Sequence, residues 1–296
     1  MRGGRLKEKA VDYWLAAGQQ ALTNSAMKEA VAQLRKGLDV LAGLPDGPWH
    51  QQQELDLQVA LRMALGATAG FAAAEVEESL GIARRLAEQL ERSDYLVPLI
   101  FGQWGLYHIR AQHRLALAQG EQLEQIGESR DDATARLVGR SLRGTSRLYL
   151  GEFVAARADL ESCIGLADPI HRAIREQTVD PYLRMLQYLA VTLAYLGYID
   201  QARSLTDEAL SGSRRLGHAN TRAGVLCLAN WMAWTTCSPV VHIEEFLALA
   251  TEHGFRNWLG WALAYHGRSL MGLGQAQEGL ALLMRGLGNY VLPAAL

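Results

Sequence analysis

The sequence predicts an all-α fold, a right-handed α-solenoid of about seven antiparallel helix pairs. Three observations predict it. One segment occurs twice, apolar or small residues recur three to four positions apart, and strand-like alternation of apolar and polar residues is hard to find. A single helix pair cannot bury its apolar face, whereas stacked pairs share one continuous core. We therefore expect the 296 residues to form a quasi-one-dimensional array.

The duplicated segment reads YLGEFVAARADLESCIG at residues 149–165 and YLGYIDQARSLTDEALSG at residues 195–212, about 46 positions later. Gly151 and Gly197 hold equivalent places, where glycine suits a tight turn between helices because it tolerates positive φ. Ala156 and Ala202 are also equivalent, and a small residue there lets two helices approach closely. Each copy is therefore predicted to be a turn followed by the second helix of a pair.

The same frame recurs more weakly elsewhere in the chain. It predicts the apolar face Met27, Ala30, Leu34 and Leu38 near the N-terminus, and the face Leu115, Ala118, Gln122 and Ile126 further on. The pattern LG-x-Φ-x-x-A, in which Φ is apolar, resembles the tetratricopeptide repeat. No linker interrupts it, so we expect one repeat domain over residues 1–296, with a short extra helix in HRAIREQ at 171–177.

Composition excludes several classes of protein. The net charge of −2 gives no basic footprint for nucleic acid or for an anionic membrane. The longest apolar region, residues 181–199, is interrupted by Arg184 and Gln187 and is too short to favour a transmembrane helix. Three cysteines are too few, and odd in number, for a disulfide framework. These features predict a cytoplasmic protein that binds neither nucleic acid nor membrane.

Four longer phrases carry a resemblance to a known family. They are AVDYWLAAGQQAL (10–22), AVAQLRKGLDVLAGLPDGP (30–48), QQQELDLQVAL (51–61) and EHGFRNWLGWAL (252–263). The chain resembles the C-terminal repeat region of bacterial proteins in which a class III adenylate/guanylate cyclase and a STAND/AAA-type ATPase precede the repeats. The resemblance implies a sensor or docking arm, a fragment of a longer protein, whose partners include the upstream domains. No G-x-x-x-x-G-K-[ST] phosphate loop occurs, so no catalytic residue is carried over.

A concave groove is the first candidate binding site. In tetratricopeptide-like folds the first helix of each pair lines the concave surface, and in this chain that frame places a set of polar side chains there. The set is Gln103, Tyr107, Arg110, Ser141, Thr145, Arg184, Gln187 and Arg268. Arginine and tyrosine are frequent anchors for peptides and small ligands. A solvated inner surface without a ligand explains the same residues, and the sequence leaves both interpretations open.

A tryptophan cluster is the second candidate. Trp231 and Trp234 form one i, i+3 pair, and Trp258 and Trp261 form another on a neighbouring helix, so each pair shares a helical face. They could line an aromatic pocket. Packing between repeats is the interpretation that we favour, because aromatic stripes at helical spacing usually face a core.

Other reactive side chains give weaker signals. His108 and His113, five apart, would lie about 140° apart on a continuous helix, which favours solvated or capping histidines over a zinc pair. Cys227 and Cys237 lack C-x-x-C spacing, and buried free thiols are the expected state. The sequence therefore indicates no metal site and no cofactor.

These features together favour a non-catalytic interaction or regulatory scaffold that binds a protein or peptide on its concave face. A small-molecule sensor that uses the tryptophans and arginines is the alternative. A helical enzyme is a third, less favoured reading, because no site presents itself. The last predicted pair, with Leu280, Leu283 and Leu287, would expose an apolar face, which suggests a homo-oligomer formed through an uncapped terminal repeat.

Overall fold

The computed structural model describes residues 2–71, 73–164 and 179–290, and these ranges contain helices and no strand. The helices are α1 (Arg2–Thr23), α2 (Met27–Leu41), α3 (Pro48–Thr68), α4 (Ala74–Gln89), α5 (Leu96–Ile109), α6 (His113–Ser129), α7 (Ala133–Tyr149), α8 (Phe153–Ile164), α9 (Pro181–Tyr195), α10 (Ile199–Leu216), α11 (Ala219–Thr235), α12 (Ile243–Glu252), α13 (Arg256–Gly272) and α14 (Ala276–Tyr290), with a 3₁₀ turn at Ser93–Tyr95. The helix predicted in HRAIREQ lies outside the described residues.

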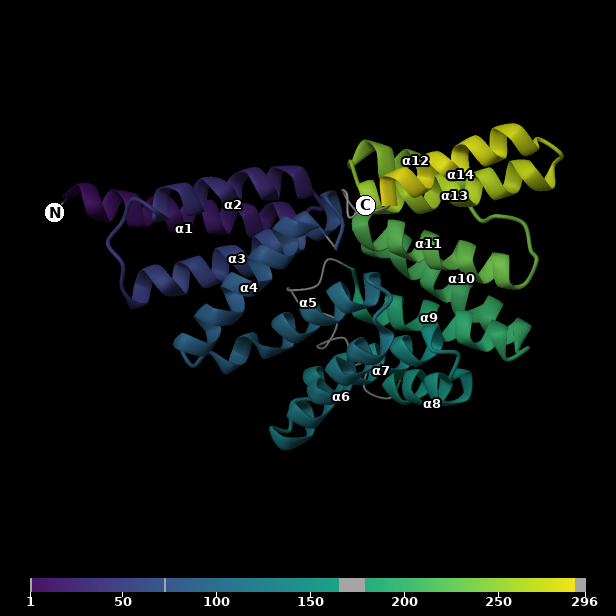
Figure 1. Ribbon diagram of the computed structural model, residues 1–296, viewed down its shortest axis with the longest axis horizontal. Helices are drawn as coiled ribbons and strands as arrows, with labels where there is room; N and C mark the ends of the chain where they lie inside the picture. The colour runs from purple at the N-terminus through teal and green to yellow at the C-terminus, as the bar shows by residue number, and fades with distance from the viewer. Residues whose placement is uncertain (1, 72, 165–178, 291–296) are drawn as a thin grey trace.

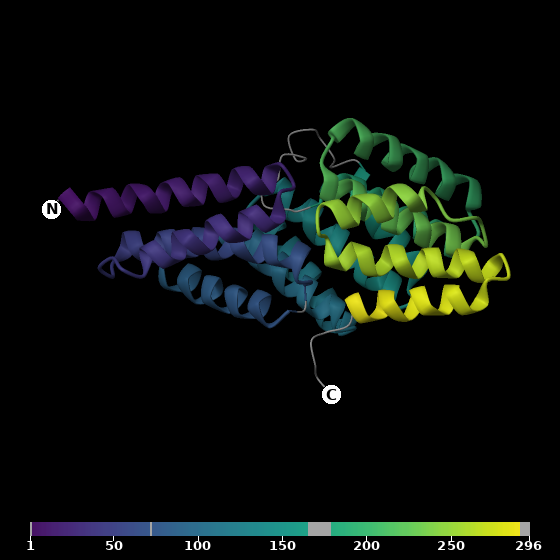
Figure 2. The same cartoon turned by 90° about the horizontal axis from the view of Figure 1, so that it is seen from above.

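The helices form consecutive pairs, α1 with α2 through α13 with α14, which stack into an α-solenoid (Figures 1 and 2). This confirms the predicted all-α repeat architecture and the number of pairs among the described residues. The largest buried cluster runs through α7 to α13, and smaller clusters lie between the earlier pairs. The core is therefore distributed along the stack in adjoining clusters, as expected when each pair buries its face against its neighbours.

Left-handed turns connect the two helices of most pairs. Gly151 has φ +80° and Gly197 has φ +85°, as their places in the duplicated segment predict. Each is followed by a hydrogen bond that closes the helix end, such as Tyr198 N to Leu193 O at 2.9 Å. Ala111 (φ 56°) takes the same conformation between α5 and α6 without glycine. The turn geometry thus persists in pairs where the glycine signature is missing.

The second helix of each duplicated pair packs through its small residue. Ala156 and Ala202 are fully buried, as predicted. In α6, however, the predicted register is wrong by one position. Leu115 is about half exposed (48%), whereas Ala116 is fully buried. The next buried position, Gly120, lies so close to α7 that an added Cβ would come within 2.7 Å of the Arg143 backbone nitrogen. This close helix contact therefore uses glycine where the weak repeat predicted larger residues.

The array closes on itself. The turn between α1 and α2 packs against the start of α11, where Ser25 Oγ accepts a hydrogen bond from the Asn220 backbone N–H (3.4 Å). His218 Nε2 lies 3.5 Å from the Leu22 carbonyl oxygen, and Met27 joins the core cluster of the later helices. Helices far apart in the sequence therefore meet, and the first helices of the intervening pairs face a shared interior (Figure 1).

The last helix, α14, exposes an apolar face that bears on possible partners. The apolar side chains Leu280 (55%), Met284 (63%) and Leu287 (48%) on α14 are exposed, while Gly279 and Gly286 face α13. That a second copy of the chain covers this surface stays a prediction.

Over the described residues, we find no helix with both the length and the apolar character needed to cross a bilayer.

Candidate ligand-binding site

A large cavity of about 1100 Å³ occupies the interior of the solenoid. Its wall comes mainly from the first helices of the pairs, α3, α5, α7, α9, α11 and α13, with His113 from the start of α6. Aromatic side chains dominate the lining: Phe71, Phe101, Trp104, Tyr149, Tyr188, Tyr195, Trp231, Trp234, Trp258, Trp261 and Tyr265. A mostly apolar cavity with a few polar groups is the usual form of a ligand pocket.

Helical spacing places these side chains together. On α9, Arg184, Tyr188 and Tyr195 recur on one face, and on α13 the same is true of Trp258, Trp261 and Tyr265. The opposite faces of these helices pack against the second helices of the pairs. Each first helix therefore contributes one stripe to the core and one to the cavity.

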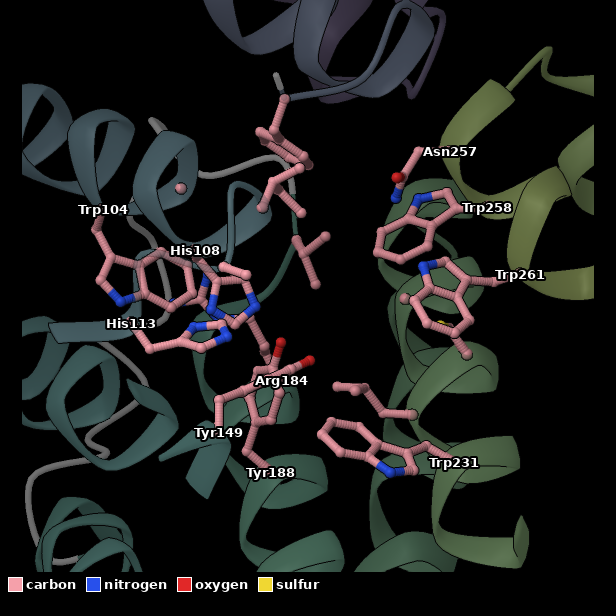
Figure 3. Close-up of a pocket in the computed structure, with 18 of the residues that line it drawn as sticks. Trp104, His108, His113, Tyr149, Arg184, Tyr188, Trp231, Asn257, Trp258 and Trp261 are labelled. Carbon is pink, nitrogen blue, oxygen red and sulfur yellow. The ribbon is translucent and has the colours of Figure 1, made fainter. Parts of the chain in front are cut away.

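Two walls of different character face each other across the cavity (Figure 3). One carries Trp104, His108, His113, Tyr149 and Arg184, and the other carries Trp231, Asn257, Trp258 and Trp261. The Trp258 indole N–H donates to Asn220 Oδ1 (2.6 Å), and the Trp231 indole N–H donates to the Tyr195 hydroxyl (3.3 Å). These bonds orient the two indole rings, and the Trp231 ring also contacts Tyr149, with ring centroids 5.2 Å apart, where the two walls meet.

All four predicted cluster tryptophans line the cavity. Trp231, Trp258 and Trp261 are half-buried, and Trp234 is 48% exposed beneath the guanidinium of Arg268, which lies 5.2 Å from its ring centroid. None is fully buried, but Trp231, Trp258 and Trp261 pack against the largest core cluster while they line the cavity. Packing between repeats and an aromatic pocket therefore both stay predictions. The stripe spacing is shared by core and cavity faces, which is why periodicity could not separate them.

Of the eight residues predicted to line a concave groove, only two line the cavity. Arg184 and Arg268 line the cavity. Ser141, Thr145 and Gln187 do not, because their helix faces turn toward the second helices and bury them almost completely. Gln187 Nε2, for example, donates to the Thr206 carbonyl of α10 at 3.5 Å.

The remaining three positions also lie elsewhere. Gln103 and Tyr107 are half-buried away from the cavity, and Tyr107 packs with the α5–α7 cluster. Arg110 is exposed and pairs with Glu77 of α4. A frame error of one or two positions along a first helix is enough to move a side chain from the inner face to a packed face.

His108 and His113 face the same cavity, which the assumption of one continuous helix had excluded. Helix α5 ends at Ile109 and α6 begins at His113, so the turn brings the two rings to a centroid distance of 5.5 Å. Burial, with smaller contributions from the nearby His113 and Arg184, lowers the pKa of His108 to about 3. Burial also lowers the pKa of His113. Both rings are therefore neutral near pH 7, and the Nδ1 atom of each is buried without a hydrogen-bond partner among the described residues.

The charges around the cavity are all of one kind. Its lining includes Arg62, Arg184 and Arg268, and no aspartate or glutamate among the described residues. Arg62 donates to the Pro98 carbonyl (3.4 Å), and Arg268 stacks on Trp234. Arg184 differs, because its Nε and Nη2 atoms are buried and find no acceptor in the described part of the chain. Its guanidinium carbon lies 4.8 Å from the Phe101 ring centroid, and burial lowers its pKa.

Groups that could support chemistry are sparse around this cavity. Cys227 is buried and Cys237 is exposed, and both thiols are free. The exposure of Cys237 corrects the expectation that both would be buried. Within the described ranges no three side chains of histidine, cysteine, aspartate or glutamate gather where they could hold a metal. The arrangement can stack a planar group, enclose an apolar one and bind an anion.

Two solved structures share the fold. A Rap protein in complex with the competence and sporulation factor is 10% identical, with a TM-score of 0.73 over 95% of this chain and 74% of that one. The apo form of RapI is also 10% identical, with a TM-score of 0.60 over 94% of this chain and 97% of that one. No protein-family model and no curated protein sequence matches the chain.

These comparisons correct the resemblance inferred from sequence phrases. Assignment to the repeat arms of cyclase–ATPase proteins is wrong, because no family model supports it and the structural neighbours are Rap proteins. The quoted phrases are rich in alanine, leucine and glutamine at helical spacing, which any helical repeat can share. At 10% identity the likeness shows the fold alone, so this chain shares the helical-repeat fold of these Rap proteins.

Proposed function

We propose that this chain is a non-catalytic regulatory binding protein that takes a peptide or a small molecule into its interior cavity. The observation that carries the proposal is the cavity itself, about 1100 Å³ in volume and lined by aromatic side chains from six helix pairs. Well-packed protein interiors hold few voids larger than a water molecule. An aromatic space of this size at the centre of a repeat array is suited to binding.

A structure of the same fold supports the proposal. The Rap protein with a TM-score of 0.73 was solved in complex with the competence and sporulation factor, so this architecture can hold a factor of that kind. Because the cavity wall spans α3 to α13, a ligand inside it would contact most of the array at once. Binding would thereby restrain the relative positions of the pairs, and the outer surface would present a changed shape to a protein partner.

We also propose that the protein acts in the cytoplasm. Its three cysteines form no disulfide, which suits a reducing compartment.

The alternative function, a small-molecule sensor, differs from peptide binding only in the ligand, because both ligands would contact the same cavity walls.

A cavity-filling variant tests the proposal. A Cβ at Gly105 would meet only Phe71 Cδ1, at 3.9 Å, so Gly105→Phe should fill part of the cavity without disturbing the packed helices. Gly81→Phe on the exposed face of α4 is the matched control. Nile red, a neutral apolar dye, should bind wild type and Gly81→Phe alike and should bind Gly105→Phe at least about tenfold more weakly. Short synthetic peptides or members of a metabolite panel should then compete with the dye. Equal dye binding by all three proteins, or no competitor in either panel, would overturn the proposal.

A further inference from the structure

The strongest unexplained feature of the molecule is the Arg184 guanidinium. A buried polar group without a hydrogen bond is costly, and a buried charge without a partner is costlier, so native proteins rarely keep either. Arg184 Nε and Nη2 are both buried and both lack an acceptor among the described residues. The wall around them supplies aromatic faces, Phe101 at 4.8 Å and Trp104 at 5.9 Å from the guanidinium carbon to the ring centroids, and no carboxylate of the described residues lines it. The charge of Asp180, at the start of α9, only partly offsets the effect of burial on the pKa of Arg184.

Arg222, another buried arginine, is fully compensated. Arg222 donates through Nε and Nη2 to the two carboxylate oxygens of Glu245, at 2.7 and 2.8 Å. Its Nη1 donates to the Leu210 carbonyl at 2.9 Å. Nε and Nη2 form one edge of the guanidinium, and that edge matches the two oxygens of a carboxylate. In Arg222 the edge is occupied by the Glu245 side chain, whereas in Arg184 no acceptor among the described residues occupies it.

The neighbours of Arg184 extend the same site. His108 and His113 are neutral near pH 7, so each ring carries one N–H that can donate to an anion, and each has a buried Nδ1 without a partner. Trp231, Trp258 and Trp261 lie across the cavity, with ring faces that suit a planar or apolar body (Figure 3). One wall therefore fits a negative charge, and the other fits an aromatic group.

We infer that the ligand of this cavity carries a carboxylate, which binds the Nε–Nη2 edge of Arg184, and an aromatic or apolar body, which packs against the tryptophan wall. The inference rests on the proposed function and specifies the class of ligand. The carboxylate can belong to a small aromatic acid or to the C-terminus of a short apolar peptide, because both present the same pair of oxygens.

Matched acid and amide pairs test this inference. The small-molecule arm uses indole-3-acetate against indole-3-acetamide, together with a panel of other aromatic acids and their primary amides. The peptide arm uses short apolar peptides ending in a free carboxylate against the same peptides ending in an amide. Binding is followed by tryptophan fluorescence and by displacement of Nile red. We expect at least one acid to bind about 10- to 100-fold more tightly than its amide, because hydrogen bonds to charged groups are the strong ones.

Variants locate the preference. Arg184→Met should remove the advantage of the acid over the amide, and Arg184→Lys should keep only part of it because lysine lacks the two-pronged edge. Arg84→Met, which replaces an exposed arginine on α4, should leave it unchanged. Melting curves of all variants establish that each is folded.

The binding results distinguish failure of the carboxylate inference from failure of the proposed function. The inference is overturned if acids and amides bind equally, if Arg184→Met retains the preference, or if no acid in either arm binds. Binding of neutral ligands that Gly105→Phe abolishes and Arg184→Met does not would retain the proposed function and reject the carboxylate. The arm that succeeds distinguishes the small acid from the peptide.

Discussion

The interface between α6, α7 and α8 and the interior cavity treat buried charge in opposite ways. At the interface, Asp159 accepts hydrogen bonds from Arg143 and Arg147, and Glu124 accepts from Arg140 and Arg143. Both carboxylates are almost fully buried, and every arginine that reaches them is paired. In the cavity, Arg184 keeps two buried N–H groups without an acceptor among the described residues. The contrast separates charges that hold helices together from a charge for which we propose a ligand.

The two regions also use glycine differently. Gly139 lies where α6 and α7 touch, and an added Cβ would come within 2.5 Å of the Glu124 backbone nitrogen. Gly105 lies on the cavity wall, where an added Cβ would have nothing closer than 3.9 Å. One region is closed to further atoms, and the other has space for them, which is the expected difference between a packed interface and a binding site.

The largest effect should come from breaking the interface network. Asp159→Ala leaves Arg143 and Arg147 without their buried acceptor, so it should lower the free energy of unfolding by about 3 kcal/mol. Urea denaturation followed by circular dichroism measures the change. Asp200→Ala, which removes a fully exposed carboxylate near Arg203, should change it by about 0.5 kcal/mol or less. Equal losses in the two variants would refute the structural role of the network.

Alanine substitutions at Gly139 and Gly105 should have smaller effects on the free energy of unfolding, and the two effects should have opposite signs. Gly139→Ala should destabilise the protein by about 2 kcal/mol, because the two helices must separate to admit the methyl group. Gly105→Ala should stabilise it by up to about 1 kcal/mol, because alanine favours the helix and the cavity has room for it. Both are read from the same urea curves. Destabilisation by both variants to the same extent would show that the cavity wall is packed like the interface.

The third effect depends on pH and should be the smallest. Burial lowers the pKa of His108 to about 3 in the folded protein, so the unfolded chain binds more protons below about pH 6.5. Stability from this group is therefore present above that pH and is lost as the pH falls. The loss should reach about 1 kcal/mol by pH 5.5. His108→Phe should flatten the profile by that amount, with the remaining slope due to groups such as His113 and His218, whose pKa values are also lowered. An unchanged slope in His108→Phe would show that the ring is accessible to protons in the folded state.

The fold was predictable because its signals are local. The turn at Gly151 and the buried Ala156 follow from residues within a few positions of each other, and their recurrence at Gly197 and Ala202 defines the repeat. Where a turn uses Ala111 or Asp131 instead, the same geometry is present without a sequence signature. The register error in α6 arose there, because Gly120 and Gly127 replace the larger apolar residues that a repeat pattern leads one to expect.

The site was only partly predictable, since it depends on which face of each first helix meets its partner. Arg184 and the four tryptophans were identified from the sequence, but so were Ser141 and Gln187, which are buried on packed faces. His108 and His113 were dismissed because the helix boundary between them was not recognised. Tyr188, four residues after Arg184, and Tyr265, four after Trp261, were missed although they continue the same stripes. Extending each aromatic stripe along its helix would have found them.

The most direct test of this account compares two arginine variants without any ligand. Arg184→Met removes a buried charge that has no acceptor in the described chain, and Arg222→Met removes one bound to Glu245 and Leu210. The account predicts that the free energy of unfolding of Arg184→Met equals or exceeds that of wild type, while Arg222→Met loses about 3 kcal/mol. If the two variants lose stability to a similar extent, Arg184 is a structural residue, and the central distinction between the cavity and the packed interfaces is wrong.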